Sequence, residues 1–367
     1  MKLETFKEKL RTAVGLAERT TGKNLSLPIL SFIKLEASER VLTLKATNLD
    51  LGIEVVLPAK VGEPGELMVS GPTINNFLGH LSKDEKVSLE TSGNVLTVVT
   101  THTRAAFTTH PVDDFPLIPR VEGGASFTLP ARRLLEGFKA VSYAASFSDI
   151  KPEIASVYIY QADGDLIFVA TDSFRLAEKR IVLESKIKEE VKLIVPIKNV
   201  GELMRVLEGA EDEVEVRFNQ NQVSLATPGI YLTSRLVDGV FPDYRQIMPT
   251  ESKTQVVALK LDLLNSFKLA TVFTDKLNQI TIRAAVTRGA CELYSRNAEV
   301  GENTTLLEAT LEGEDLEASY NVRYILDGFP SLVLDSITLR FNGKNRPLVL
   351  AAVGDSTFTY LVMPLNR

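Results

Sequence analysis

One sequence motif occurs three times in this chain at almost equal intervals. Each copy is a run of β-forming residues that leads into a polar corner, and the corner begins at Ala46, Ala170 and Ser295. The offsets between these positions are 124 and 125 residues. In a chain of 367 residues, each third is long enough to bury a core of its own. The repeat therefore predicts three copies of one domain design.

Each third is predicted to contain two amphipathic helices, because apolar residues recur there at helical spacing. The first helices are expected at 3–17, 129–146 and 261–273, and the second helices at 73–81, 198–207 and 322–328. Alternating apolar and polar residues predict strands after each second helix, for example at 86–91, 213–218 and 336–341. We therefore predict an α+β fold of three domains, each with two helices packed on antiparallel sheets, at 1–120, 126–249 and 254–367.

Composition restricts the kind of function. The formal net charge is −6, whereas a protein that holds nucleic acid mainly by bulk attraction is usually basic. A nucleic-acid role therefore needs basic residues gathered on one face, or a hold that is not electrostatic. No apolar run approaches the roughly 18–20 residues that span a membrane, and the N-terminal residues lack the apolar core of a signal peptide. Together with the lone Cys291, this favours a cytoplasmic protein without a membrane partner.

The sequence gives little support to an enzyme. His102 and His110 have no cysteine or carboxylate at the spacing of a zinc site. Phosphate-binding loops of the Gly-x-x-x-x-Gly-Lys type and Gly-x-Ser-x-Gly motifs are absent from the sequence. Asp113 and Asp114 leave a carboxylate-dependent nuclease as an alternative, although neighbouring aspartates before Phe-Pro more often form a turn. We expect no catalytic residue, metal or cofactor. A second alternative is a peptide-binding scaffold that never binds DNA.

Several longer motifs carry a resemblance to a known family. They are Leu-Pro-Ile-Leu at 27–30, Thr-Asn-Leu-Asp at 47–50, Asp-Phe-Pro at 114–116, Ala-Thr-Asp at 170–172, Arg-Leu-Ala at 175–177, Ser-Arg-Leu-Val-Asp-Gly at 234–239, Phe-Pro-Asp-Tyr-Arg at 241–245 and Val-Met-Pro at 362–364. In these motifs and in its threefold repeat, the whole chain resembles the bacterial sliding clamps, the β subunits of replicative DNA polymerases.

The resemblance implies a noncatalytic processivity factor. In that family, two three-domain subunits join head to tail into a six-domain ring, the DNA clamp fold. Helices line the hole, through which duplex DNA passes. The implied partners are the catalytic subunit of the replicative DNA polymerase, other polymerases, repair or ligation factors that carry a clamp-binding peptide, and an ATP-driven clamp loader. Such a ring tethers its partners to DNA without reading the bases.

The resemblance also assigns site residues. A pocket for client peptides between the second and third domains maps to Ile154, Thr171, Ser173, Phe174, Arg175, Leu176, Pro242, Ile247, Leu361, Val362, Met363, Pro364 and Leu365. From the residues alone, these apolar positions could equally be strand-end core. Ser173 and Phe174 stand where the family usually has Gly-His, and Phe174 would add an aromatic wall.

Two further sets follow from the resemblance. DNA contacts map to Lys23, Asn24, Ser148, Lys151 and Lys198, which could otherwise be solvated surface residues. Asn24, Pro152 and Glu153 replace residues that are often arginine or aromatic in the family. The dimer interface maps to Phe107, Val272 and Phe273, which could instead be intramolecular core. We favour the interface, because an exposed aromatic at a sheet edge needs a cover.

Overall fold

The structure is a computed structural model that describes residues 1–22, 27–81, 86–183, 187, 190–249 and 251–365. The chain forms two compact units. Unit 1 combines Met1–Leu135 with Lys198–Asp238, and unit 2 combines Glu136–Ile197 with Gly239–Arg367. The division passes through the middle third of the chain, because the two halves of that third belong to different sheets.

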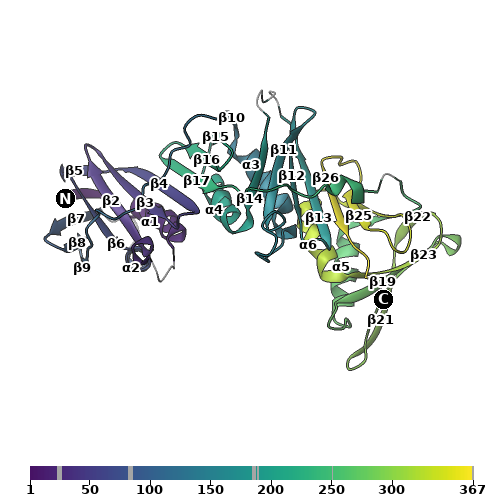
Figure 1. Ribbon diagram of the computed structural model, residues 1–367. Coiled ribbons are helices and arrows are strands. Elements are labelled where there is room, and N and C mark those ends of the chain that lie inside the picture. The colour runs from purple at the N-terminus through teal and green to yellow at the C-terminus, as the bar shows by residue number, and fades with distance from the viewer. Residues whose placement is uncertain (23–26, 82–85, 184–186, 188–189, 250, 366–367) are drawn as a thin grey trace. The chain divides into compact units, whose positions relative to one another are not determined.

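Unit 1 is built on two sheets whose neighbouring strands are all antiparallel (Figure 1). The first sheet has the order β5-β1-β7-β8-β9, with strands Lys60–Glu63, Lys2–Phe6, Lys86–Ser92, Val95–Val99 and Arg104–Thr108. The second has the order β10-β15-β16-β17-β4-β3-β2-β6, with strands Ala125–Pro130, Glu213–Phe218, Gln222–Thr227, Ile230–Arg235, Leu51–Pro58, Val41–Thr47, Phe32–Ser38 and Gly65–Ser70.

Unit 2 is also built on two antiparallel sheets. The larger has the order β14-β11-β12-β13-β26-β25-β24-β18-β22, with strands Lys192–Pro196, Ser156–Ala162, Asp165–Thr171, Arg175–Ile181, Phe358–Val362, Leu348–Ala352, Ser336–Phe341, Thr254–Leu259 and Ala309–Gly313. The smaller has the order β21-β20-β19-β23, with strands Gly301–Leu307, Ala290–Asn297, Gln279–Ala285 and Leu316–Asn321.

Helices cover these sheets. The α-helices are α1 (Lys7–Thr20), α2 (Gly71–His80), α3 (Ala131–Val141), α4 (Ile197–Glu208), α5 (Lys260–Thr271) and α6 (Val322–Gly328). The short 3₁₀ turns are η1 (Pro28–Ser31), η2 (Ser142–Ala144), η3 (Tyr244–Ile247), η4 (Val286–Arg288) and η5 (Phe329–Ser331). In unit 1, α1 packs on α2, β3 and β4 and buries Leu10 and Val14. In unit 2, α5 packs on α6, β20 and β21. No helix in the described ranges is both long and apolar enough to cross a membrane.

The expected start of the first helix at residue 3 was wrong, because residues 2–6 form β1 and α1 begins only at Lys7. The strands β10 and β18 likewise precede α3 and α5, but those helices begin at Ala131 and Lys260, close to the expected starts at 129 and 261. Leu3 therefore belongs to a strand that alternates buried and exposed side chains and pairs with both β5 and β7. A stretch of only five residues can fit both the helical period of about 3.6 residues and the strand period of about 2 residues. Long-range strand pairing decides between the two structures.

Two close helix–sheet contacts in unit 2 depend on glycine. A Cβ atom at Gly137 of α3 would lie 2.5 Å from the ring of Phe168 on β12. A Cβ atom at Gly328 of α6 would lie 2.4 Å from the ring of Tyr360 on β26. Both rings are fully buried. The missing side chains let the two helices approach the aromatic side chains of the larger sheet closely.

Candidate functional site

The repeated corner in the middle third is a turn held by its own side chains. The hydroxyl of Thr171 donates a hydrogen bond to the carbonyl oxygen of Arg175 (2.7 Å). Asp172 Oδ1 accepts from the backbone N–H groups of Phe174 (2.9 Å) and Arg175 (3.0 Å). Short polar side chains satisfy the backbone of a tight turn in this way, which explains why the phrase Thr-Asp lies between β12 and β13.

The same hydrogen-bonding pattern occurs in the first third, and its Asn/Asp part recurs in the last third. Thr47 donates to the carbonyl oxygen of Leu51 (2.8 Å), and Asn48 Oδ1 accepts from the Leu51 N–H (2.8 Å). In the last third, Asn297 Oδ1 accepts from the Glu299 N–H (2.9 Å). The sequence repeat is therefore a repeat of corner chemistry. It places β4, β13 and β21 at equivalent positions in the three thirds.

The middle corner differs from the other two by presenting an aromatic side chain. Phe174 is 59% exposed and stacks on Tyr324 of α6, with ring centroids 6.4 Å apart. Ser173 before it has φ of +77°, in the left-handed region that costs a side chain roughly 1–2 kcal/mol. A glycine would adopt this φ without that cost. Ser173 keeps the turn geometry of glycine, and Phe174 adds a ring at its edge.

Arg175 ties the corner to α6. Its Nε donates to Asp172 Oδ2 at 2.9 Å, and its Nη1 donates to Asp327 Oδ2. The guanidinium carbon also lies 4.7 Å from the ring centroid of Tyr324, a cation–π distance. Burial acts to lower the pKa of Arg175, but Tyr360 and Asp172 outweigh it, so that pKa is raised. The buried guanidinium remains charged and fixes Tyr324 beside the corner.

The end of the chain runs directly past this corner. β26 pairs with β13, with Arg175 opposite Val362 and Leu176 opposite Leu361. Beyond the strand, the Met363 N–H donates to the carbonyl oxygen of Phe174 (2.8 Å). The Leu365 N–H donates to the carbonyl oxygen of Ser319 on β23 (2.8 Å). Residues 363–365 are thus held beside Phe174 while their side chains stay half-exposed.

The turn η3 is anchored to the same sheet by an aromatic network. The Tyr244 hydroxyl donates to Glu178 Oε2 on β13. Arg245 Nη2 donates to the Tyr160 hydroxyl (2.8 Å), which lies 2.7 Å from the Tyr244 hydroxyl. Burial and then the Glu178 carboxylate raise the pKa of Tyr244, so its phenol stays protonated and able to donate. This network places the exposed Ile247 at the end of a fixed turn.

The predicted peptide-site residues all lie in unit 2 but differ in exposure. The buried members are Ile154, Thr171, Leu176, Leu361 and Val362. The exposed or half-exposed members are Ser173, Phe174, Pro242, Ile247, Met363, Pro364 and Leu365. The pairing of β13 with β26 brings the corner and the chain end together.

Four residues that shape this surface were not predicted from the sequence. Tyr324 and Asp327 fix the corner, and Tyr244 and Glu178 fix η3. Asp327 lies 152 residues from Arg175, and nothing in its local sequence marks it as a partner. Only the pairing of β13 with β26 and the packing of α6 bring the two together.

Comparison with known proteins decides the family. Family models of the DNA polymerase III beta subunit match the N-terminal domain at residues 1–119, the central domain at 128–243 and the C-terminal domain at 245–366. The chain belongs to the beta sliding clamp family. The beta sliding clamp of Synechococcus elongatus is 28% identical, over 100% of this chain and 99% of the relative.

Solved structures of the clamp family have the same fold. The DNA polymerase III beta subunit of Thermotoga maritima superimposes with a TM-score of 0.94 at 26% identity, covering 100% of this chain and 99% of that one. The corresponding subunit of Pseudomonas aeruginosa gives 0.93 at 24% identity, covering 100% of both chains. Members of this family are noncatalytic processivity subunits that tether a DNA polymerase. The fold of three repeated domains and the noncatalytic function that we expected are thus confirmed.

The residues that the resemblance to the clamp family assigns to DNA contacts differ in exposure and ion pairing. Lys23 and Asn24 lie outside the described residues. Ser148 and Lys151 are exposed in the loop that follows η2. Lys198 is also exposed, but its Nζ lies 2.6 Å from Asp50 Oδ2. This ion pair offsets part of the charge that Lys198 could present to a phosphate.

The three residues expected at the clamp's dimer interface also differ. Phe107 on β9 is 8% exposed and packs edge-on against Phe77 of α2, at 5.2 Å between centroids. It is therefore not the exposed aromatic that we expected, because its own α2 covers it. Val272 is 59% exposed. Phe273 is half-exposed and lies beside Gly301, where β21 begins.

Proposed function

We propose that two copies of this chain close head to tail into a ring that encloses duplex DNA. The ring would slide along DNA and hold a DNA polymerase to it by way of the peptide-binding surface of unit 2. The single observation that carries this proposal is the way sheets continue from one third of the chain into the next.

Two such junctions occur within the chain. The corner strand β4 of the first third pairs with β17, the last strand of the middle third. The corner strand β13 of the middle third pairs with β26, the last strand of the final third. The remaining corner strand is β21, and the remaining last strand is β9. Both are edge strands of their sheets. Edge strands with unpaired backbone groups are ready to pair with another chain.

The repeat also specifies the register of the missing junction. Ile53 lies opposite Leu232 in the first junction, and Ala177 lies opposite Tyr360 in the second. The equivalent pair would be Asn303 on β21 and Ala105 on β9 of a second copy. A contact between two different surfaces closes into a ring when the rotation per subunit allows it. With three domains in each chain, two copies would give six domains around the hole.

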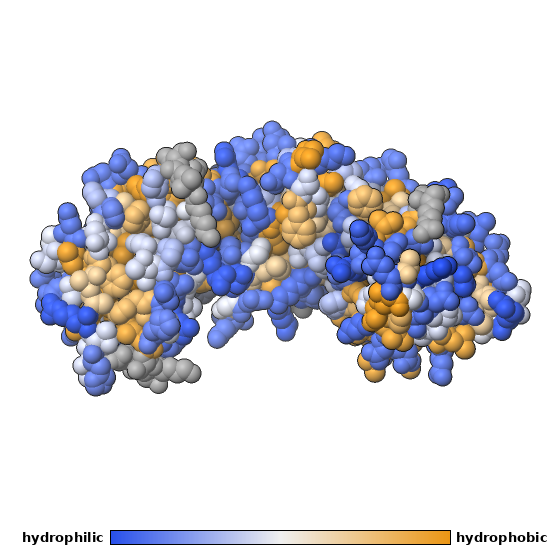
Figure 2. Space-filling view, turned by 90° about the horizontal axis from the view of Figure 1, so that it is seen from below, coloured by the Kyte–Doolittle hydropathy of each residue, from blue (hydrophilic) through white to orange (hydrophobic). Residues whose placement is uncertain are grey.

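Enclosure accounts for a DNA-binding protein with a negative net charge. On the face seen in Figure 2, hydrophobic residues occur in small groups among hydrophilic ones. The chain carries 41 lysines and arginines against 47 acidic residues, so bulk attraction to phosphates is weak. We infer that Ser148, Lys151 and Lys198 make only modest phosphate contacts, and that topology keeps the ring on DNA.

Partners would dock on the surface formed by Phe174, Ile247 and Met363. Their exposed apolar side chains suit a short peptide with two or three apolar anchors, each gaining roughly 1.5–3 kcal/mol on burial. Ordering of the peptide offsets much of this gain, so we expect an affinity near micromolar. Polymerases and repair or ligation factors that carry such a peptide would exchange there. A separate ATP-driven loader would open the ring, and we expect this to occur in the cytoplasm.

Retention on DNA of two topologies tests the ring. A clamp loaded by a loader and ATP onto nicked circular DNA should remain bound after the salt is raised from 50 to 200 mM. That change weakens an electrostatic binder with 6–10 phosphate contacts about 10³–10⁵-fold. Cutting the same plasmid once should release the protein by sliding. Equal retention on the circular and the cut plasmid would contradict enclosure.

A further inference from the structure

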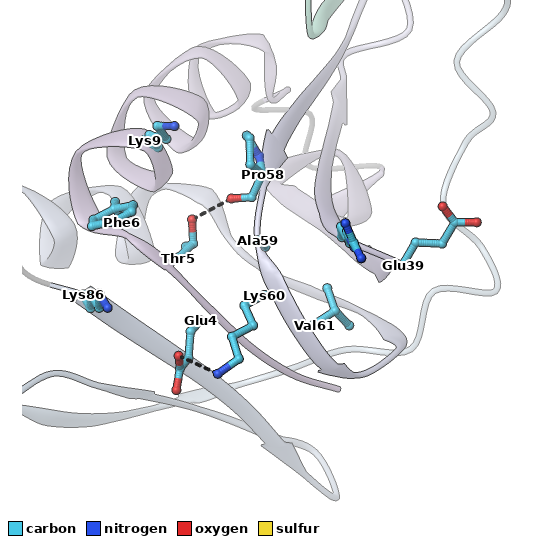
Figure 3. Close-up of a pocket in the computed structure, with 11 residues that line it drawn as sticks. Glu4, Thr5, Phe6, Lys9, Glu39, Pro58, Ala59, Lys60, Val61 and Lys86 are labelled. Carbon is cyan, nitrogen blue, oxygen red and sulfur yellow. Dashed lines mark hydrogen bonds and ion pairs between the residues drawn. The ribbon is translucent and has the colours of Figure 1, made fainter.

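A pocket of about 600 Å³ lies in the first third of the chain, within unit 1. Its walls come from β1, the first turn of α1, the turn between β2 and β3, and the passage from β4 into β5. The residues that line it are Glu4, Thr5, Phe6, Lys9, Glu39, Arg40, Pro58, Ala59, Lys60, Val61 and Lys86. Figure 3 shows Phe6 and Lys9 on one side and Lys60 and Val61 across from them. Its volume falls in the range of ligand-binding sites.

The inner surface of this pocket is apolar and fixed. Phe6 is 52% exposed, an unusual state for phenylalanine, and Pro58 and Val61 extend the apolar area. The hydroxyl of Thr5 donates to the carbonyl oxygen of Pro58 (3.1 Å), as drawn in Figure 3. This bond joins β1 to the end of β4. An apolar side chain could therefore pack against Phe6 without a rearrangement of the backbone.

Cationic side chains surround the apolar area. Cations outnumber carboxylates four to two in the lining, in a chain whose net charge is −6. Within the described ranges, Lys9, Arg40 and Lys86 make no ion pair. Lys60 reaches a carboxylate of Glu4 only at 3.8 Å. The pocket thus has positive charge available for an anionic ligand.

A free strand edge borders the pocket. β5, which supplies Lys60 and Val61, is the terminal strand of its sheet and pairs only with β1 among the described strands. Its outer backbone N–H and C=O groups can pair with an extended peptide added as a further strand. Nucleic acid would gain less from this edge, because it has no peptide backbone to add as a strand.

We propose that this pocket binds an extended acidic peptide of a partner protein, with one aromatic side chain packed on Phe6. The aromatic side chain would occupy the apolar area, and carboxylates on both sides of it would meet Lys9, Arg40 and Lys86. The backbone of the peptide would pair along β5. This site belongs to unit 1 and is separate in chemistry from the apolar peptide surface of unit 2.

Fluorescence anisotropy with synthetic peptides tests the site. The probe is dye-labelled Asp-Glu-Phe-Asp-Asp, compared with the same peptide carrying alanine in place of phenylalanine. Wild-type protein should bind the first saturably, and the alanine peptide about 5-fold or more weakly, because it cannot pack on Phe6. Lys9→Glu should also weaken the first peptide about 5-fold or more, because it places a like charge at the pocket. A glutamate in the first turn suits a helix, so the variant should fold.

Arg11→Glu is the matched control, since it makes the same charge change on α1 at an exposed residue outside the pocket. It should leave peptide affinity within about 2-fold. An equal loss in both variants would mean bulk attraction and would overturn the proposal. Tighter binding of a thymidine decanucleotide, with the same sensitivity to Lys9→Glu, would overturn it in favour of single-stranded DNA. Absence of saturable peptide binding at millimolar concentration would also overturn it.

Discussion

The backbone of Met363 is part of the fold, whereas its side chain is available for binding. It lies just beyond β26, and its backbone N–H is held by the carbonyl oxygen of Phe174. Its side chain is half-exposed, whereas its neighbour Val362 is fully buried. The backbone bond does not depend on the side chain. Methionine is also a flexible side chain that adapts to different partners.

Met363→Ala should weaken the binding of a client peptide by roughly 1–3 kcal/mol, because it removes an apolar contact at the centre of the proposed surface. The melting temperature should hardly change, because the side chain contributes little to the core. Anisotropy with a labelled client peptide and thermal unfolding measure the two effects. Val353→Ala, which also shortens a half-exposed side chain in unit 2, is the control and should change neither.

A sharp fall in melting temperature with unchanged peptide affinity would place Met363 in the core. The peptide surface would then lie elsewhere.

At the scale of elements, helices approach the sheets of unit 2 closely where glycine faces an aromatic ring. Gly137 of α3 is buried against Phe168. In an exposed helix, replacing glycine by alanine stabilises by up to about 1 kcal/mol. At Gly137, a Cβ atom 2.5 Å from a fully buried ring cannot be accommodated without a shift of the helix. Overpacking of this kind costs about 1–3 kcal/mol.

We therefore predict that Gly137→Ala lowers the free energy of unfolding by about 1–2 kcal/mol, the overpacking cost less the gain in helix propensity. Gly201→Ala in α4 is the matched control, because nothing lies within 4 Å of its Cβ position. It should be neutral or stabilising by up to about 1 kcal/mol. Urea unfolding curves measure both. Similar effects of the two substitutions would show that α3 does not need a close approach to β12.

At the scale of the whole molecule, one last strand and one corner strand of the repeat lack the partner that their counterparts have among the described strands. They are β9 in the first third and β21 in the last, and both are edge strands. The two junctions inside the chain show that corner strands and last strands of this repeat fit one another. Phe273 lies next to the start of β21, where a second copy would cover it.

Phe273→Glu should convert a dimer into monomers, because burying an unpaired carboxylate at the junction costs several kcal/mol. Light scattering at micromolar concentration should give the mass of two chains for the wild type and of one chain for the variant. Val333→Glu makes a similar change at an exposed apolar residue of the same third, and it should remain a dimer. A monomeric wild type at this concentration would contradict the ring.

The sequence by itself determined the repeat, the type of most elements and the chemistry of the corners. Short-range physics sets these features. Thr171 and Asp172 bond to backbone groups within four residues, and helical spacing needs only one or two turns to be recognised. Thr-Asn, Thr-Asp and Arg-Asn at nearly equal spacing, each after a run of β-forming residues, were therefore enough to relate the thirds. The family followed from longer motifs, and the function followed from the family.

Only the tertiary structure decided which strands continue into one another and what surrounds each site residue. The β1 strand at residues 2–6 depends on pairing with β5 and β7, some 55–90 residues away. Arg175 finds Asp327 across 152 residues, and Phe107 is covered by Phe77 of α2. Burial and ion pairing depend on the whole set of neighbours, so no local pattern separates the buried Leu361 from the half-exposed Met363 two residues later.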